Sequence, residues 1–109
     1  EEWGRLDRWY SKQFSYFLDK MKNTTDVNGS LLDNTLILYG SACSTTHNAR
    51  NYPLILAGGS DLGVKHGSYT VFEEKDERMS NLLLSMLNKL DIEKESFSDS
   101  TGKLSANII

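Results

Sequence analysis

An amphipathic pattern of apolar and charged positions opens the chain. Its apolar residues recur every three or four positions, which is the spacing of one helix face. They are Trp3, Leu6, Tyr10, Phe14, Phe17, Leu18 and Met21, with Trp9 beside them. Charged side chains occupy much of the opposite face. We therefore predict a helix over residues 2–22, whose aromatic face packs on the core of the domain or, alternatively, on a partner.

Two near-continuous apolar runs, residues 35–40 and 53–59, follow this helix. Such runs are typical of strands that are buried on both faces, as in a parallel sheet covered by helices. Residues 68–72 are rich in β-formers and predict a short third strand. A second helical pattern predicts a helix over residues 79–90, with Ser80 or a neighbour as its N-cap.

The order of these elements indicates a layered α/β architecture. We expect a small, mostly parallel sheet flanked by two main helices. So few elements cannot cover such a sheet, and its edges would stay open unless further chain joins them. We therefore expect residues 1–109 to be a single domain and a fragment of a larger protein. Its expected partner is the missing N-terminal part of the same protein or a second copy.

Composition and charge narrow the classes of function. Apolar residues make up 39% of the chain and charged residues 25%, as in ordinary globular proteins. The net charge is −3 and no basic block is present, so we do not expect nucleic acid as a partner. The apolar runs are far shorter than the roughly 20 residues that cross a bilayer. Cys43 is the only cysteine, which excludes an intramolecular disulfide and a site of several thiolates.

The polar segment between the two apolar runs, residues 41–52, is the candidate functional loop. It follows the carboxyl end of a predicted strand, where ligands bind in open parallel α/β sheets. Ser44, His47 and Arg50 are its candidates for binding an anion or another ligand. His47 is also the candidate metal ligand or general acid–base. The alternative is a structural loop whose side chains hydrogen-bond to its own backbone.

Other chemistry-bearing residues give weaker signals. A catalytic metal needs about three protein ligands, and His66 is the only other histidine, so a metal site at His47 would need ligands from outside this chain. Cys43 has no neighbours that stabilise a thiolate, so we interpret it as inert. Gly58 and Gly59 match no nucleotide-binding pattern, and we interpret them as a turn at a strand end.

Several segments together resemble an uncharacterised family of secreted bacterial proteins, a domain of unknown function. The segments are residues 6–10, 31–41, 46–59, 62–67, 81–87 and 97–102. They cover most of the chain in one order, and the match is to the C-terminal part of such a protein. The resemblance implies export, and hence a periplasmic or secreted location. The family is in turn similar to the alkaline phosphatase and sulfatase superfamily, which implies the C-terminal portion of an alkaline-phosphatase-like layered fold.

In that superfamily a strand like residues 35–39 ends at a metal-binding pair, Asp-His or Asp-Asn. Here the strand is followed by Gly40, Ser41 and Ala42, and His47 is the available substitute. The resemblance therefore implies one of two functions. The first is a protein that acts on or binds phosphate or sulfate esters, with a divalent metal in the complete protein. The second is a non-catalytic binding or assembly protein that has lost the metal site. Whether the protein is an enzyme stays open at this stage.

Overall fold

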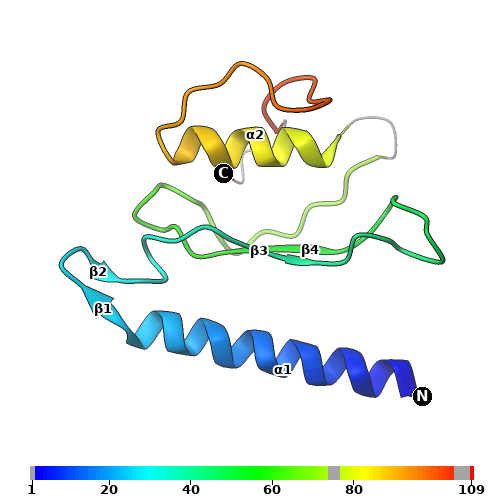
Figure 1. Cartoon of the computed structure of the whole chain (residues 1–109), viewed down its shortest axis with the longest axis horizontal. Helices are drawn as coiled ribbons and strands as arrows, with labels where there is room; N and C mark the ends of the chain where they lie inside the picture. The colour runs from blue at the N-terminus through cyan, green and yellow to red at the C-terminus, as the bar shows by residue number, and fades with distance from the viewer. Residues whose placement is uncertain (1, 74–76, 105–108) are drawn as a thin grey trace.

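The chain is arranged in three layers (Figure 1). A computed structural model describes residues 2–73, 77–104 and 109. The middle layer is a two-stranded sheet formed by β3 (Ile37–Gly40) and β4 (Leu54–Ala57). Helix α1 (Glu2–Asn23) lies on one side of this sheet, and helix α2 (Met79–Lys89) lies on the other. A small hairpin of β1 (Thr25–Asp26) and β2 (Gly29–Ser30) links α1 to the middle layer.

The two helices confirm the predictions from apolar periodicity. α1 ends one residue later than predicted, because side chains satisfy the carbonyl groups of its last turn. Asn23 Nδ2 donates to the Asp19 carbonyl at 2.8 Å, and Thr24 Oγ1 donates to the Lys20 carbonyl at 2.8 Å. Ser80 is not the N-cap of α2 and lies buried in the first turn of the helix. The cap position is the nearby Arg78, whose side chain makes no capping hydrogen bond.

The prediction of a small, mostly parallel sheet in an alkaline-phosphatase-like fold is wrong. β3 and β4 pair antiparallel, with Leu38 opposite Leu56 and Gly40 opposite Leu54. A parallel pair would need a crossover connection, usually a helix, whereas residues 41–53 return the chain directly into β4. A continuous apolar run reports only that both faces of a strand are covered. Here one helix on each side of the sheet covers both faces of β3 and β4. The apolar pattern of a strand does not depend on whether its neighbour is parallel or antiparallel.

Two smaller differences concern short strands. The predicted strand at residues 68–72 is wrong, because this segment is irregular in the structure. The β1–β2 hairpin was not predicted. The Asp26 carboxylate accepts the Asn28 N–H at 2.7 Å and Gly29 adopts a φ of 107°, which together close this tight turn. Two-residue strands are too short to show an alternating pattern.

The buried core is small and lies against α2. Its apolar members within the described residues are Val64, Leu82 and Leu84. Gly58 and Gly59 turn the chain out of β4 with φ values of 73° and 72°, as the sequence interpretation expected. The Gly59 N–H donates to the Leu32 carbonyl at 2.9 Å, which ties this turn to the segment before β3. None of the described helices is long and apolar enough to cross a membrane.

Candidate functional site

The predicted loop connects the carboxyl end of β3 to the start of β4. Because these strands are antiparallel, the carboxyl end of β3 lies next to the amino end of β4, and the two carboxyl ends lie at opposite ends of the sheet. The loop therefore does not lie at a shared carboxyl edge, which is where parallel sheets bind ligands. This topology therefore gives residues 41–52 no shared binding edge, and what they can bind depends on their own contacts.

Much of the loop is hydrogen-bonded to itself. The Ser44 N–H donates to the Asn48 carbonyl at 2.9 Å, and the Asn48 N–H donates to the Thr45 carbonyl at 3.3 Å. The Ser44 hydroxyl lies 3.5 Å from the same Asn48 carbonyl. Farther up the loop, Ser41 Oγ donates to the Cys43 carbonyl at 2.6 Å. Ser44 therefore serves the turn itself, as the structural interpretation of this loop expected.

His47 lies at the tip of this turn. Its backbone φ is 53°, in the left-handed region that non-glycine residues seldom adopt. The side chain is exposed, and its imidazole makes no hydrogen bond within residues 2–73, 77–104 and 109. Over the same residues, no group of three or more His, Cys, Asp or Glu side chains is placed to hold a metal ion. His47 thus belongs to no set of three possible metal ligands in the described part of the chain.

Arg50 is the one predicted site residue that lines a groove. The groove has a volume of about 850 Å³ and lies between β4, residues 65–73 and the first turns of α2. Ser44 and His47 lie outside its lining, so the structure does not bring the three predicted residues together. The Arg50 guanidinium is exposed and forms no ion pair with another described residue. Lys65 lines the same groove.

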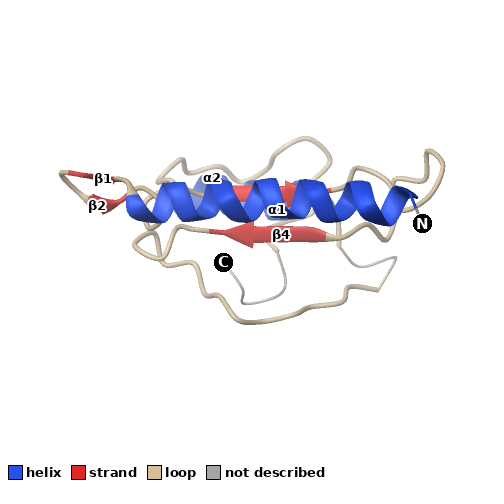
Figure 2. Cartoon of the chain, turned by 90° about the horizontal axis from the view of Figure 1, so that it is seen from below, coloured by secondary structure: helices blue, strands red, loops and turns tan. Residues whose placement is uncertain are grey.

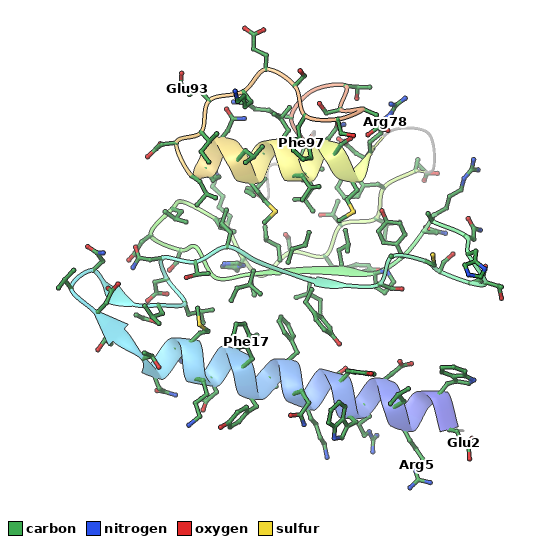
Figure 3. The ribbon with its side chains drawn as sticks, viewed as in Figure 1. Glu2, Arg5, Phe17, Arg78, Glu93 and Phe97 are labelled. Carbon is green, nitrogen blue, oxygen red and sulfur yellow. The ribbon has the colours of Figure 1, made fainter. Side chains whose placement is uncertain are left out.

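The walls of the groove are largely apolar. Leu54 and Leu56 of β4 form one wall, and Met79 and Leu82 of α2 form another. Figure 3 shows the side chains of α2 and of the β3–β4 sheet pointing toward one another in the space between them. The third wall is the segment after β4, which contains Tyr69. A volume of this size exceeds what a bound ion needs and is in the range of sites for larger ligands.

A polar cluster that joins α2 to the C-terminal tail was not identified from the sequence. Asn81 is 3% exposed, its Oδ1 accepts the Thr101 N–H at 2.9 Å, and its Nδ2 donates to Glu77 Oε2 at 2.8 Å. One turn later, Ser85 Oγ accepts the Leu104 N–H at 2.8 Å. These contacts hold the C-terminal tail on α2. The sequence signal was a pair of small polar residues four positions apart within an otherwise apolar helix face.

An ion pair lies in the lining of the groove. Arg78 donates to the Asp99 carboxylate at 3.3 Å and to the Asp99 carbonyl at 2.7 Å. The Ser80 hydroxyl near this carboxyl lowers the pKa of Asp99, and the Arg78 cation lowers it further. The approach of Ser80 is loose, because its buried Oγ makes no well-formed hydrogen bond to any described group. We therefore regard the Arg78 contact as the better-defined one.

The aromatic side chains of α1 form a second, larger feature. No residue of this helix is buried. Phe17 lies on the side of α1 that faces the sheet (Figure 3) and is still 45% exposed. Trp9 and Tyr16 are seven residues apart, beside the predicted stripe rather than within it, and are 54% and 61% exposed. The helix thus carries exposed aromatic rings around a wider arc than its own sheet covers.

Comparison with known proteins adds no relative. No family model, curated protein or solved structure matches this chain.

Proposed function

We propose that this chain is a non-catalytic binding or assembly module whose helix α1 packs between its own sheet and another polypeptide. The observation that carries the proposal is the exposure of aromatic rings around α1. Trp3, Trp9 and Tyr16 are 80%, 54% and 61% exposed. A soluble domain rarely leaves such a set open unless it forms an interface. Aromatic residues are also the side chains that contribute most to interfaces.

The energetics favour burial of these rings. Burying a large apolar side chain is worth about 2 kcal/mol, whereas fixing it at an interface costs about 1 kcal/mol. Several rings on one helix therefore contribute favourably to association, against the cost of lost translational and rotational freedom. The small sheet points the same way, because an isolated pair of strands is only marginally stable in water. A partner that covers α1 would also hold the helix against β3 and β4.

The resemblance to secreted bacterial proteins supports an exported setting for this module, either periplasmic or secreted. In that setting the partner of α1 is further N-terminal sequence of the same protein or a second copy of this chain. The absence of a metal-binding pair after β3 supports the non-catalytic reading over hydrolysis.

A test of this proposal uses the hydrodynamic behaviour and stability of the 109-residue chain. We expect marginal stability at high dilution and self-association as the concentration rises, with blue-shifted tryptophan emission. Replacing Trp9 and Tyr16 with glutamine should weaken association. The matched control is Val27→Gln in the β1–β2 turn, where the side chain is 99% exposed. A dilute monomer that unfolds cooperatively with about 5 kcal/mol or more of stability would refute the proposal.

Binding of phosphate or sulfate esters is the second candidate function. It is supported by Arg50, whose guanidinium lines the groove together with Lys65 and forms no ion pair with a described residue. A guanidinium binds such anions through two parallel hydrogen bonds. A divalent metal would have His47 as one ligand, with the other ligands supplied by chain outside these residues. The proposal predicts that Arg50→Gln weakens binding of inorganic phosphate about tenfold or more, whereas Arg8→Gln on exposed α1 does not. Equal binding by both variants would reject this candidate.

A further inference from the structure

The free edge of β4 has main-chain groups without partners. The Ser41 N–H donates to the Pro53 carbonyl at 3.2 Å, so these two residues form a hydrogen-bonded pair of the antiparallel ladder. Such pairs alternate along the strands, so Tyr39 with Ile55 is the next hydrogen-bonded pair. The N–H and C=O groups of Leu54 and Leu56 must then point outward. They form no hydrogen bond with any other group in the described part of the chain.

Pro53 leaves the outward edge of β4 intact. It immediately precedes β4, and proline is tolerated at the first position of a strand although it lacks an N–H. Its position falls on the inward side of the ladder, opposite Ser41. The outward side of β4 therefore keeps every donor it has. Unpaired edge groups of this kind form a ready template for another strand.

A second unpaired segment lies across the groove from β4. Residues 68–72 have the composition of a strand, yet they are irregular and make no hydrogen bond within the described part of the chain. Tyr69 is 93% exposed. Figure 2 shows the chain after β4 swinging away from the edge of that strand before it returns to α2. The groove occupies the space between β4 and this segment. Both long walls of the groove thus offer N–H and C=O groups that no described residue pairs with.

We propose that an extended segment of a partner polypeptide binds in this groove as a strand between β4 and residues 68–72. This inference deepens the proposed assembly function and rests on it. The added strand pairs with Leu54 and Leu56 on one side and gives the segment around Tyr69 a ladder on the other. Main-chain hydrogen bonds of this kind supply affinity, and the apolar walls select alternate side chains. The predicted third strand then forms only when its neighbour is present.

The charges around the groove define the chemistry of the partner further. Arg50 precedes the start of β4, and Lys65 lies beside its end, because the neighbouring His66 ring is 2.8 Å from the Gly58 carbonyl. Neither cation forms an ion pair with a described residue. Glu73 and Glu77 also line the groove, as does the Arg78–Asp99 pair, so the charges act locally and not through an excess of one sign. The expected partner segment is therefore apolar at alternate positions and acidic where its ends meet Arg50 and Lys65.

The test uses a defined peptide and the full 109-residue chain. The probe is a capped peptide in which threonine and valine alternate over about six residues, the length of a typical strand, between two glutamates. Amide hydrogen exchange is followed by NMR. We expect the peptide to slow exchange of the Leu54 and Leu56 amides about tenfold or more. A peptide with lysines in place of the glutamates should bind the chain more weakly. The glutamate peptide should also bind the Lys65→Glu variant more weakly than the unmodified chain.

Proline variants separate strand addition from other kinds of binding. Leu56→Pro removes an outward donor, and Val27→Pro in the β1–β2 turn is the matched control. Leu56→Pro could also unfold the β3–β4 pair. Replacing both Tyr69 and Thr70 with proline avoids this, because it alters only residues that make no hydrogen bond within the described part of the chain. We expect each groove variant to lower peptide affinity about fivefold or more. Failure of the peptide to bind, or equal binding by the groove variants and the control, would overturn strand addition. Association through α1 would survive that result, so the two proposals fail separately.

Discussion

Phe14 of α1 stacks on Tyr39 of β3, with ring centroids 4.2 Å apart and ring planes 10° apart. This is the aromatic contact that joins the first helix to the sheet among the described rings. Stacked rings contribute about 1 kcal/mol beyond the area that they bury. Since α1 has no fully buried residue, its position depends on a few half-buried contacts of this type.

We therefore predict that Phe14→Ala lowers the free energy of unfolding by about 2 kcal/mol and frees α1 from the sheet. This is less than the 3–5 kcal/mol typical of a fully buried phenylalanine, because Phe14 is only partly buried. Urea denaturation followed by circular dichroism measures the change. Tyr16→Ala is the matched control on the same helix, and its 61% exposed ring should change stability by less than about 0.5 kcal/mol. Equal losses in the two variants would contradict this role of the stack.

Gly58 gives a second prediction, about the turn that follows β4. Its φ is 73°, and a Cβ at this position would collide with the Thr35 carbonyl. Gly58→Ala should therefore destabilise the protein by about 2 kcal/mol or more, from backbone strain together with the clash. Gly67→Ala is the control, with a φ of 89° and no atom within 4 Å of the added Cβ. It should cost about 1 kcal/mol, from strain alone. Thermal unfolding compares the two, and a similar loss in both would show that the Thr35 carbonyl can move aside.

Asp99 gives a prediction about pH. Its pKa is lowered from 3.8, first by the Ser80 hydroxyl and then by Arg78, so the folded state favours the ionised carboxylate. The resulting stabilisation is fully present above pH 3.8 and is lost as the pH falls through the lowered folded value. We expect NMR titration of the Asp99 carboxyl to give a midpoint below 3.8, and Arg78→Gln to raise that midpoint. The effect on stability should be small, because the pair is exposed. An unchanged midpoint in Arg78→Gln would show that the ion pair does not form in solution.

The sequence predicted those parts of the fold whose signal is local. Apolar residues three and four apart identify α1 and α2, because one face of a helix must be covered wherever the helix lies. The runs at residues 35–40 and 53–59 identified β3 and β4 but not their antiparallel pairing. Pairing direction depends on the path of the connecting loop, and residues 41–53 lack a pattern that fixes it. The strand predicted at residues 68–72 failed for a related reason, since strand formers need a neighbour with which to pair.

The candidate site shows the same limit, because contacts between residues that are distant in the sequence could not be predicted. Ser44, His47 and Arg50 were grouped because they share a loop, and the structure places only Arg50 on the groove. The contact between Asn81 and Thr101 was missed, because it joins residues 20 positions apart. The unpaired donors of β4 became visible only once the register was known. Closeness in the sequence therefore did not show which side chains line the same groove.

The contact of Asn81 with the tail supports a final prediction. Its Oδ1 accepts the Thr101 N–H at 2.9 Å, and its Nδ2 donates to Glu77 Oε2 at 2.8 Å and to Thr101 Oγ1 at 3.1 Å. Asn81→Ala removes a side chain that is 3% exposed together with its three hydrogen bonds, so it should cost about 2–3 kcal/mol. Hydrogen exchange across residues 97–104 should rise, because the tail loses its attachment to α2.

Asn81→Asp separates the two roles of the amide. The aspartate keeps an acceptor for the Thr101 N–H but loses the donor and places a carboxylate beside Glu77. We expect a destabilised protein at neutral pH that recovers as the pH falls toward about 4, where a carboxyl can carry the shared proton. Wild-type protein should show no such recovery over the same range, and denaturation at several pH values provides the measurement. A variant that stays equally destabilised at every pH would mean that the donor to Glu77 matters less than the acceptor geometry at Thr101.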